Sequence, residues 1–416
     1  MREHGNSAAN SRPLRIGLLT HSVNPRGGVV HTLELAHALH DAGHEVTVMA
    51  PALPGQTMFR PVRCELNLMP IPTPAKTAEP QDLYGTVSAR IHACERHLER
   101  RLQHLTFDVL HAQDPIGANA LATMRERGLI DGFVRTVHHL DTFDDPRLMA
   151  RQQRGFEAAQ QVLCVSQLWC DVLQRDHGIA AALVHNGIDC QRYTRQADAS
   201  DAQVAARYGL RGGVSGGLSA PVFPSVGGIE ERKNTVRLLD AFIALRAQMP
   251  SAQWVIVGGA SLLNHDACVA AFNARLADSG LTVGPGQDIV LTGTVADDHM
   301  PALYRAADVL VMPSLREGFG LVVLEALACG TPTVASAIAP FTEHLSDADC
   351  CWCDPHDALS MADAMRRALA PERSAALAQH TPEVCLRHSW AASAVRHVAL
   401  YRAHVAQARP LAALPA

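Results

Sequence analysis

The sequence predicts an α/β protein made of two doubly wound, parallel-sheet domains. The chain has 416 residues, which is more than one ordinary hydrophobic core organises. A strand–helix–strand alternation starts near Leu14 and starts afresh near Pro221, and units of this kind require a parallel sheet. Hydrophobic residues make up 48% and charged residues 19% of the chain, which is the balance of a folded globular protein.

Composition also excludes several classes of protein. The formal net charge of -5 argues against a general nucleic-acid binder, which needs a basic face to meet phosphates. The 11 cysteines are odd in number and scattered, as in a reducing compartment, where cysteine acts as a small hydrophobe. No charged-then-apolar leader opens the chain, and residues 1–13 are expected to be a disordered tail. We therefore expect a cytoplasmic protein.

The first domain is expected to span residues 14–200. Its first strand is the apolar run LRIGLLTHS, and the helix that follows has apolar residues at helical spacing up to Gly43, a natural helix stop. HEVTVMAP then gives a second strand, so that strand, helix and strand form a Rossmann-like βαβ unit. The Pro-rich segment 54–80 is expected to be an irregular, mobile loop at the rim of this domain.

The second domain is expected to span residues 221–385. It opens on the strand PVFPSVGGI and a helix over 235–249, and WVIVGG, IVLTG, DVLVMPS and TPTVAS are typical of its further strands. The segment before it is rich in Gly, Ser and Ala, and predicts a linker over 201–220, with one short helix in the wider segment 194–220. Residues 386–416 are expected to form a C-terminal helix.

The cysteine cluster Cys350, Cys351 and Cys353, near His356, has two interpretations. It could hold a metal ion, but it lacks a second ligand pair at zinc spacing. The run DCCWCD is also typical of a short buried strand. We favour the strand and expect no metal site.

Two further segments raise the question of membrane contact. The apolar stretch 321–341 carries Glu325 and is broken by Gly-Thr-Pro at 330–332, so it is not a membrane-spanning helix. The segment 90–105, RIHACERHLERRLQHL, predicts a helix with a basic face. That face is either solvated or in contact with a membrane or an acidic acceptor, and a solvated face is favoured.

The strongest motif is PSLREGFGLVVLEALACGTP, residues 313–332. A strand ends at Ser314, a glycine-containing loop follows, and a helix begins near Gly320. The first turn of a helix leaves backbone N–H groups free, and its dipole favours an anion there. Because Gly318 and Gly320 allow close approach to the backbone at the carboxyl end of a parallel strand, the motif indicates a phosphate-binding site.

Two carboxylates flank this motif. Glu317 lies on the loop, and Glu325 lies in the otherwise apolar helix LVVLEALA. An unpaired buried carboxylate is costly, so Glu325 is expected to meet water, a cation or a hydroxylated ligand. The alternative for Glu325 is a salt bridge, or a helix edge that faces solvent.

Glu317 and Glu325 around EGFG, followed by CGTPTVAS, closely resemble the donor-site signature of the family 4 glycosyltransferases, which have the GT-B fold. Other segments are similar to the family's motifs in the same order over nearly the whole chain. They are the glycine loop PRGGVVHTLELAHAL, the catalytic-histidine strand TVHH, the end of the acceptor domain in VSQLWCDVL and VHNGID, the donor-phosphate lysine segment GGIEERKN, and the final helix HSWAASAVRHVALYRAHV, which crosses back to the first domain. The resemblance implies two Rossmann-like domains that face a cleft, and GGIEERKN suggests a poorly characterised bacterial branch.

The resemblance assigns donor-binding roles in the second domain. Lys233 would meet the donor diphosphate, where an ammonium offsets the charge that develops on the leaving group. Glu325 would accept hydrogen bonds from the ribose hydroxyls, and Glu317 would contact sugar hydroxyls near the reacting carbon. The diphosphate would also meet the backbone N–H groups of Phe319, Gly320 and Leu321, and the nucleobase would rest near Thr292 and Gly293.

The resemblance also assigns residues of the first domain. Gly27 and Gly28 would let this domain approach the diphosphate. His138 would lie near the sugar and polarise a hydroxyl or the transition state. His139 is the alternative, but His138 follows Thr136 as the family's TxH pattern requires.

One position departs from the family pattern. The family commonly has an Arg five positions before the donor-phosphate lysine, and Gly228 stands there. Arg232 is adjacent to Lys233 and is either a replacement for the missing cation or a solvated surface residue. We favour the solvated residue slightly, because neighbouring side chains on a loop need not point the same way.

The implied function is that of a hexosyltransferase. It would move a hexosyl group from a UDP- or GDP-sugar to a hydroxyl acceptor, with retention at the anomeric carbon. We expect no cofactor and no metal, because the chain shows no Asp-x-Asp site placed to hold a divalent ion against the diphosphate, and the pairs at 144–145 and 297–298 are adjacent residues in loop-like segments. The alternatives are a GT-B-fold nucleotide-sugar epimerase and a degenerate, non-catalytic nucleotide-sugar-binding protein. The two glutamates favour the transferase.

Overall fold

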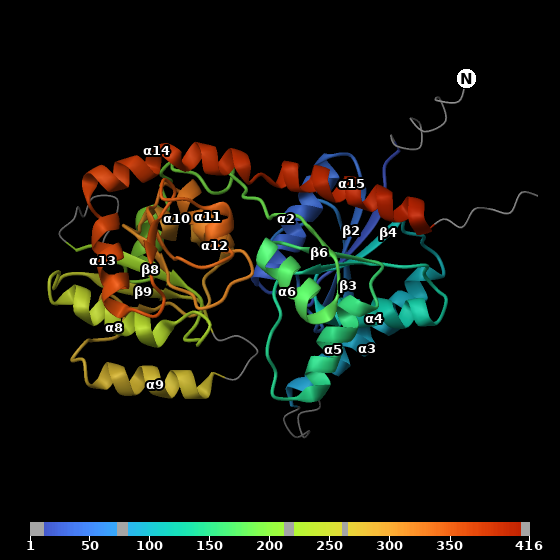
Figure 1. The fold of residues 1–416 in the computed structure, drawn as a ribbon, viewed down its shortest axis with the longest axis horizontal. Coiled ribbons are helices and arrows are strands. Elements are labelled where there is room, and N and C mark those ends of the chain that lie inside the picture. Colours follow the sequence, from blue (N-terminus) through green and yellow to red (C-terminus); the bar gives the residue numbers. More distant parts are fainter. Residues whose placement is uncertain (1–11, 73–81, 212–219, 260–264, 409–416) are drawn as a thin grey trace, which may run out of the picture. The chain divides into compact units, whose positions relative to one another are not determined.

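A computed structural model of the chain describes residues 12–72, 82–211, 220–259 and 265–408. The chain divides into two compact units (Figure 1), one made of Met1–Gly187 with Trp390–Ala416 and the other of Ile188–Ser389. The predicted boundaries at 200/201 and 385/386 lie 13 and four residues from the divisions at 187/188 and 389/390. The second unit starts earlier than expected because ion pairs such as Arg192–Asp297 attach its first residues to it.

The first unit contains one parallel sheet of seven strands. Their order is β3-β2-β1-β4-β5-β6-β7. The strands are β1 (Arg15–Leu19), β2 (Glu45–Ala52), β3 (Glu65–Pro70), β4 (Val109–Ala112), β5 (Val134–Val137), β6 (Gln161–Cys164) and β7 (Ala181–Leu183). The first strand pairs with both the second and the fourth, so the direction of winding reverses between β1 and β4. This reversal is the topological switch point, beside which open α/β sheets bind their ligands.

Helices connect these strands, and one of them comes from the far end of the chain. They are α2 (Gly27–Asp41), α3 (Leu83–Leu102), α4 (Pro115–Glu126), α5 (Pro146–Glu157), α6 (Gln167–His177) and α15 (Trp390–Ala408). In Figure 1, α15 lies alongside α2. The hydroxyl of its fully buried Tyr401 lies 2.6 Å from Nδ1 of His111 on β4. The expected C-terminal helix is therefore part of the core of the first unit.

Strand β3 corrects the prediction for residues 54–80, which we expected to be irregular throughout. Glu65–Pro70 pairs in parallel with β2, and only Met69 is buried in it. This edge strand lacks the continuous apolar run by which a buried parallel strand is recognised. Its proline is tolerated because an edge strand can spare a backbone donor. Residues 73–81 of the expected loop lie outside the described residues.

The second unit contains two parallel sheets of three strands, in the orders β10-β9-β8 and β11-β12-β13. The strands are β8 (Val222–Val226), β9 (Gln253–Val257), β10 (Ile289–Leu291), β11 (Leu310–Met312), β12 (Thr333–Ser336) and β13 (Cys351–Cys353). The N–H groups of Asp308 and Val309 donate to the carbonyl of Val222 at 3.0 and 3.3 Å and join β8 to β11. The second unit therefore repeats the winding of the first, with its switch point between β8 and β11.

The helices of the second unit are α7 (Asp201–Arg207), α8 (Thr235–Arg246), α9 (Asp266–Ala277), the 3₁₀ helix η2 (Asp297–His299), α10 (Met300–Arg305), α11 (Leu321–Ala328), α12 (Phe341–His344), α13 (Ala358–Ala368) and α14 (Pro371–Arg387). Helix α7 is the short helix expected in the linker segment, and residues 212–219 of the predicted linker lie outside the described residues. The interpretation of the cysteine cluster as a strand is confirmed, since Cys351 and Cys353 are buried in β13.

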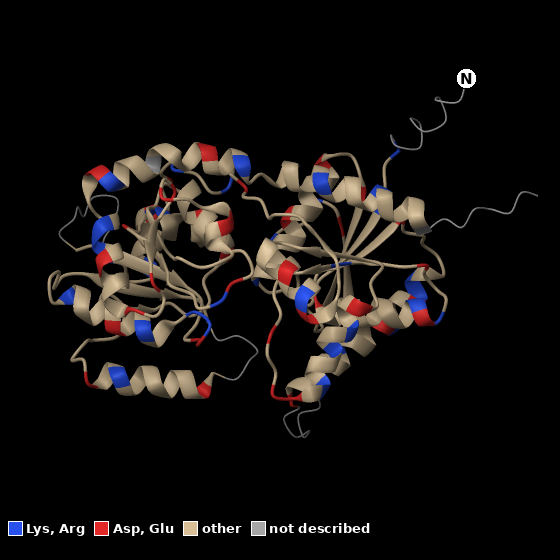
Figure 2. Ribbon diagram, in the orientation of Figure 1, with Lys and Arg blue, Asp and Glu red and all other residues tan. Residues whose placement is uncertain are grey.

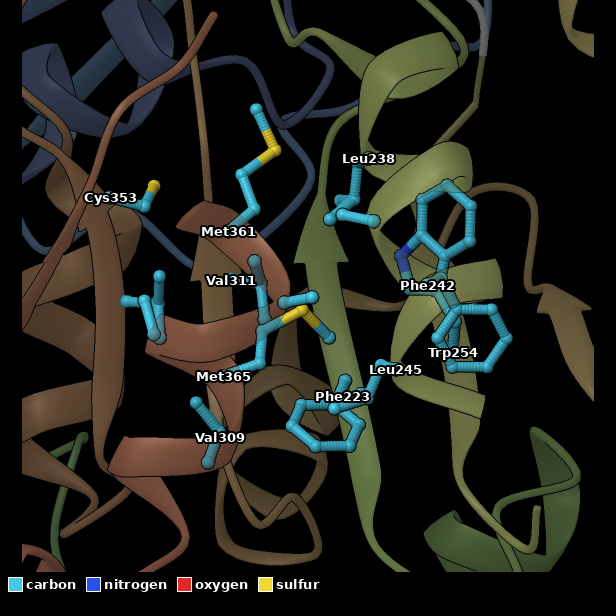
Figure 3. Packing of buried hydrophobic residues seen from close by; sticks show 14 of the residues in the cluster. Phe223, Leu238, Phe242, Leu245, Trp254, Val309, Val311, Cys353, Met361 and Met365 are labelled. Carbon is cyan, nitrogen blue, oxygen red and sulfur yellow. The ribbon is translucent and has the colours of Figure 1, made fainter. Parts of the chain in front are cut away.

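The core of the second unit is built around large rings between the sheet and two helices (Figure 3). Phe242 of α8 and Trp254 of β9 have ring centroids 5.8 Å apart, and Met365 of α13 belongs to the same buried cluster. The indole N–H of Trp254 donates to the hydroxyl of Ser225 at 3.0 Å, so this large side chain is buried with its polar atom satisfied. The core thus fixes β8 and β9, whose carboxyl ends lead into the site described below.

Acidic and basic residues are mixed along the helices rather than sorted onto one side. Figure 2 shows this on α13, where Asp363 forms ion pairs with Arg366 and Arg367. Such exposed pairs contribute little to stability. Among the described residues, no helix has both the length and the apolar character needed to cross a membrane.

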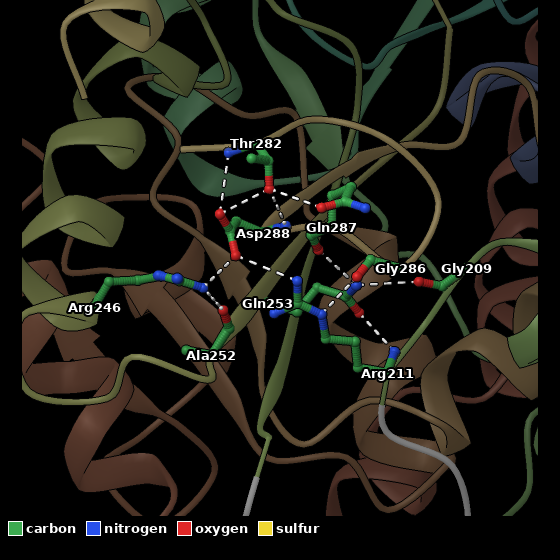
Figure 4. Close-up of polar contacts among 9 residues, drawn as sticks. All are labelled: Gly209, Arg211, Arg246, Ala252, Gln253, Thr282, Gly286, Gln287 and Asp288. Carbon is green, nitrogen blue, oxygen red and sulfur yellow. Dashed lines mark hydrogen bonds and ion pairs between the residues drawn. The ribbon is translucent and has the colours of Figure 1, made fainter. Parts of the chain in front are cut away.

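A buried acid ties the start of β10 to the rest of the second unit (Figure 4). Asp288 is 9% exposed. Its carboxylate accepts from Arg246 at 2.7 Å, from Arg211 at 3.3 Å, and from the N–H and hydroxyl of Thr282 at 3.0 and 2.9 Å. Burial raises the pKa of Asp288, but the hydrogen bonds from Thr282 and the two arginine charges lower it by more. The ionised form of Asp288 is therefore favoured in the folded chain.

We predict that Asp288→Asn lowers the free energy of unfolding of the second unit by about 1–2 kcal/mol at pH 7. The folded-state pKa lies below the unfolded one, so the stabilisation is present above the unfolded pKa of about 3.9 and is lost as the pH falls through the folded pKa. Urea unfolding at pH 7 and at pH 3 measures both effects. Asp278→Asn, an exposed acid after α9, is the control. An equal loss of stability at both pH values would contradict this role.

Candidate active site

The loop between β11 and α11 carries the motif singled out in the sequence. It runs from Pro313 to Gly320, and α11 begins at Leu321, as the sequence predicted. Gly320 precedes the helix with φ 95°, in the left-handed region that favours glycine. A Cβ atom there would also collide with the ring of Phe341. The chain turns sharply at Gly320, and the first N–H groups of α11 have no intrahelical acceptor.

Glu317 lies on this loop and holds together three polar side chains. Its Oε1 lies 2.5 Å from Nζ of Lys233 and 3.2 Å from Nη1 of Arg232, and it accepts from the hydroxyl of Ser314 at 3.1 Å. The side chains of Glu317 and Lys233 are 9% and 15% exposed, and that of Arg232 is 30% exposed. Arg232 points to the same carboxylate as its neighbour, although its side chain keeps part of its contact with solvent.

The charged groups of this cluster shift one another's pKa values. Burial raises the pKa of Glu317, and the charges of Lys233 and Arg232 lower it by more, to about 2. Burial lowers the pKa of Lys233, and the carboxylate of Glu317 offsets part of that decrease. Glu317 is therefore an ionised hydrogen-bond acceptor at neutral pH.

Asn234, to which the sequence analysis gave no role, sets the direction of the lysine loop. It has φ 60°, the one positive φ of a non-glycine residue in the described chain. Its side-chain amide donates to the carbonyl of Pro313 at 3.0 Å and to that of Pro355 at 2.7 Å. The loop after β8 is thereby tied to the end of β11, which brings Lys233 to Glu317. Asparagine is among the few residues that tolerate the left-handed backbone region. Its presence after Lys233 was therefore the one feature of the sequence that could have indicated this turn.

A small cavity opens between the carboxyl ends of β8 and β11. Its volume is about 10 Å³, roughly the space of one water molecule. Gly228 and Lys233 line it, together with residues of both strands. Gly227, with φ 136°, lies against the aliphatic stem of Lys233, at distances of 3.0–3.2 Å from the position of an added Cβ. The lysine therefore enters at the switch point of the second unit, where a bound anion is expected in this topology.

Glu325 has a partner that the sequence did not suggest. It is 7% exposed on α11 and accepts a hydrogen bond of 2.7 Å from the hydroxyl of Tyr304, a fully buried residue of α10. The sequence predicts water, a cation or a hydroxylated ligand as the partner of Glu325, or else a salt bridge or a helix edge that faces solvent. A side chain of the protein itself supplies the hydroxyl, and burial excludes the solvent-facing edge.

The remaining predicted donor residues lie at the same edge of the second unit. Thr292 and Gly293 follow β10, and the Gly293 carbonyl accepts from the Gly258 N–H at 3.1 Å. Phe319, next to Gly318, is 3% exposed and stacks on His344 with centroids 4.3 Å apart. Its side chain anchors the loop, while its backbone leads into α11.

The residues predicted for the first unit gather around its own switch point. Gly27 and Gly28 begin α2, and an added Cβ on Gly28 would lie 3.7 Å from the ring of His138, which follows β5. His138 Nε2 lies 3.3 Å from Oε1 of Gln113, whereas the side chain of His139 lies 3.4 Å from Asp141. Of the two histidines, His138 is the one that faces the glycine loop.

The imidazole of His138 is neutral at physiological pH. Burial lowers its pKa well below the ordinary value, and the positive charges of neighbouring histidines and Arg135 lower it further. The ring of His31 lies edge-on to it, with centroids 4.6 Å apart. A neutral imidazole can accept or donate one hydrogen bond at a substrate hydroxyl, but it brings no positive charge.

Two family models match the chain. Residues 25–192 match the family described as Glycosyltransferase Family 4, and residues 217–382 match Glycosyl transferases group 1. The chain is a family 4 glycosyltransferase. The two matches follow the enzyme's two compact units in order, so each half of the expected architecture matches a glycosyltransferase family model.

Curated relatives carry glycosyltransferase names. The enzyme is 28% identical over 417 residues to D-inositol 3-phosphate glycosyltransferase of Salinispora arenicola, with 91% of this chain and 89% of the relative covered. It is 25% identical over 335 residues to mannosylfructose-phosphate synthase of Agrobacterium fabrum, with 74% and 71% covered. It is 29% identical over 350 residues to phosphatidyl-myo-inositol mannosyltransferase of Mycolicibacterium smegmatis, with 81% and 79% covered.

Solved structures show the same fold. Sucrose-phosphate synthase from Thermosynechococcus elongatus matches with a TM-score of 0.73 at 21% identity, over 94% of this chain and 99% of that one. HepE from Anabaena, in a complex with UDP and glucose, matches with a TM-score of 0.72 at 15% identity, over 94% and 100%. The enzyme therefore has the GT-B fold that the sequence predicted.

We predict that Gly320→Ala destabilises the second unit by more than the 1–3 kcal/mol expected from backbone strain alone. The added Cβ meets both a positive φ and the ring of Phe341. Gly280→Ala is the matched control, because Gly280 has φ 71° and open space around its Cβ position. Thermal unfolding of the two variants measures the difference. Equal losses would show that contact with Phe341 does not constrain this turn.

Proposed function

We propose that the enzyme moves a hexosyl group from a UDP- or GDP-sugar to a hydroxyl acceptor, with retention at the anomeric carbon and without a metal ion. The observation that carries this proposal is the convergence of Lys233 and Arg232 on Glu317. The cluster lies beside the switch-point cavity and on the loop that leads into α11. Cations, helix N–H groups and an ionised acid at one strand edge suit a sugar diphosphate, which has an anionic and a hydroxylated part.

Charge on the leaving diphosphate grows as the glycosidic bond breaks. In this proposal Lys233 and Arg232 oppose that growth, so their contribution is larger in the transition state than in the ground state. An ammonium has three N–H donors, and the one directed at Glu317 holds it in place. Arg232 takes the role of the arginine that the family usually has at the position of Gly228.

The other predicted residues complete the donor site. Glu317, ionised and on the loop before α11, would accept from sugar hydroxyls close to the reacting carbon. Glu325 would accept from the ribose, with the Tyr304 hydroxyl fixing the orientation of its carboxylate. The base would lie near Thr292 and Gly293, which follow a neighbouring strand. The solved complex of HepE with UDP and glucose agrees with UDP as a carrier for this fold.

The first unit would contribute the glycine loop and His138. Gly27 and Gly28 would allow its backbone to approach the diphosphate. The neutral ring of His138 would hydrogen-bond to a sugar or acceptor hydroxyl near the reacting carbon. Because His138 lies against Gly28, the two would act at one place.

Two observations support transfer without a metal ion. Asp297 forms an ion pair with Arg192 at 2.6 Å, and Asp145 accepts from Arg147 and caps α5. One acid of each adjacent pair therefore already has a structural partner. The cations at Glu317 would neutralise the diphosphate instead. Since all 11 cysteines are free thiols, we also propose the cytoplasm as the site of action.

We predict that Glu325→Gln weakens binding of UDP or GDP by about 1.5–3 kcal/mol, since a charged hydrogen bond to the ribose is lost. Free nucleotide and nucleotide sugar should be affected alike. Tyr304→Phe should weaken binding less, because it keeps the carboxylate and removes only the hydroxyl that orients it. Isothermal titration measures the affinities. Unchanged nucleotide affinity in Glu325→Gln would remove the ribose role.

The decisive experiment measures donor turnover, as transfer or as slow hydrolysis of the nucleotide sugar. We expect activity in excess EDTA, a product with retained anomeric configuration by NMR, and near-complete loss in Lys233→Ala. Arg232→Ala should lower kcat by about tenfold for each 1.4 kcal/mol of transition-state stabilisation removed. Arg316→Ala, an exposed cation on the same loop as Glu317, is the charge-matched control. An active Lys233→Ala would contradict the donor site, and full loss in EDTA would contradict metal independence.

A further inference from the structure

Arginines in the interior of this chain are usually neutralised by an acid. Arg305 lies 2.6 Å from Asp201, and Arg246 lies 2.7 Å from Asp288, as Figure 4 shows for the second pair. This is the expected arrangement, because a buried charge without a counter-ion is costly. Arg135, on β5 of the first unit, is a buried arginine that has no such acidic partner among the described residues.

Arg135 is 4% exposed, and its guanidinium meets only backbone carbonyls. Nη1 donates to the carbonyls of Thr136 and, at 3.5 Å, of Ala112. Its Nε is buried without a hydrogen-bond partner. Within the described chain, no carboxylate lies at ion-pair distance from it. Because Ala112 ends β4 and Thr136 is next to the end of β5, the guanidinium lies at the carboxyl edge of the sheet.

A second arginine reaches the same edge from α3. Arg90 Nη1 donates to the carbonyl of His21, two residues beyond β1, at 3.3 Å, and it too forms no ion pair with the described residues. The expectation of a solvated basic face for this helix holds for exposed residues such as Arg96. It does not hold for Arg90, which turns inward and is half-buried.

One acid, Asp114, lies within the electrostatic reach of both arginines. It raises the pKa of each, although burial has the larger effect and lowers the pKa of Arg135 to about 10. Asp114 Oδ1 caps α4 by accepting from the Gly117 N–H at 2.9 Å, and its Oδ2 is buried without a hydrogen-bond partner. Burial lowers the pKa of His21, so that ring is neutral at pH 7. The charge of Arg26 also acts on His21, so the positive charges at this edge outnumber the one acid.

This edge is on the substrate side of the first unit. His138 and His21 approach the Cβ position of Gly28 to 3.7 and 4.0 Å, and Arg90 bonds to the backbone of the same His21. The cationic groups therefore adjoin the histidine proposed to act at the reacting centre. They also flank the switch point between β1 and β4, where this topology places ligands.

We propose that Arg135 and Arg90 form an anion subsite that binds a phosphate group carried by the acceptor. This rests on the proposed function and adds the chemical class of the acceptor, a hydroxylated molecule with a phosphomonoester. A phosphate would supply the counter-ion that both guanidinium groups lack among the described residues. Arginine forks match phosphate oxygens in geometry as well as in charge. The anion has a second possible source, the diphosphate of the donor.

The test uses the full-length enzyme and four probes: glucose, glucose 6-phosphate, inorganic phosphate and UDP. Isothermal titration and thermal shift report binding, since a ligand of the folded state raises its apparent stability. We expect glucose 6-phosphate and inorganic phosphate to bind and glucose not to bind. Failure of both phosphates to bind would overturn the proposal.

The variants Arg90→Gln and Arg135→Met separate the two sources. Each should lower the affinity for glucose 6-phosphate by about tenfold or more and leave the affinity for UDP unchanged. Arg96→Gln, an exposed charge on the same helix, should leave both affinities unchanged. If Arg135→Met does not fold, Arg90→Gln decides alone, because its side chain is half-buried at the edge of the core. If both variants weaken the binding of UDP and of glucose 6-phosphate equally, the cluster belongs to the donor diphosphate and the acceptor subsite is overturned. Unaltered phosphate binding in both variants would also overturn the acceptor subsite.

These outcomes are distinguishable from failure of the proposed function. Hydrolysis of a UDP- or GDP-sugar by the unaltered enzyme reports the donor reaction without any acceptor. Donor hydrolysis that proceeds while neither phosphate probe binds refutes the anion subsite alone. Absence of donor hydrolysis refutes the proposed function, whatever the phosphate probes show.

Discussion

The candidate site of the second unit depends on one buried carboxylate. The carboxylate of Glu317 forms ion pairs with a lysine and an arginine and accepts a hydrogen bond from a serine hydroxyl. The two cations come from the loop after β8, and the serine comes from the loop after β11. Removing the acid would leave Lys233 as a buried charge without its counter-ion, which is strongly destabilising. The ion pair therefore holds the two loops at a fixed separation. The cavity between β8 and β11 can persist because that separation is fixed.

The same logic explains why the charged groups lie where they do. Apolar side chains fill the two faces of each sheet, and polar ones collect at the carboxyl edges, where loops leave the layers and backbone groups are unpaired. In the second unit the cations Lys233 and Arg232 are in ion pairs with Glu317. In the first unit Arg135 and Arg90 form no ion pair with the described residues. The two edges therefore differ in how far acids of the protein neutralise their cations, although their strand orders correspond.

Some elements of the fold and the site could be predicted from the sequence, and others could not. Strands β1, β8 and β11 are continuous apolar runs because helices cover both faces, and they were predicted within a few residues. The edge strand β3 was not, since half-exposed residues give no such run. The direction of Arg232 depends on the left-handed backbone of Asn234 and on its bonds to two distant carbonyls, which no local pattern reveals. Likewise, Tyr304 lies on a separate helix from Glu325, so helical spacing alone did not pair them.

The division of the chain has a consequence for the order in which its parts are completed. The second unit is an insertion, and Ile188 donates to the carbonyl of His388 at 2.8 Å, so the polypeptide enters and leaves this unit side by side. During synthesis the inserted unit is complete once residue 389 has been made. The first unit, begun earlier, still lacks α15, whose Tyr401 reaches His111 inside the sheet. Domains generally fold as units while the chain emerges. The half that starts first is therefore the half that finishes last, and its histidine-lined interior stays open until the final helix arrives.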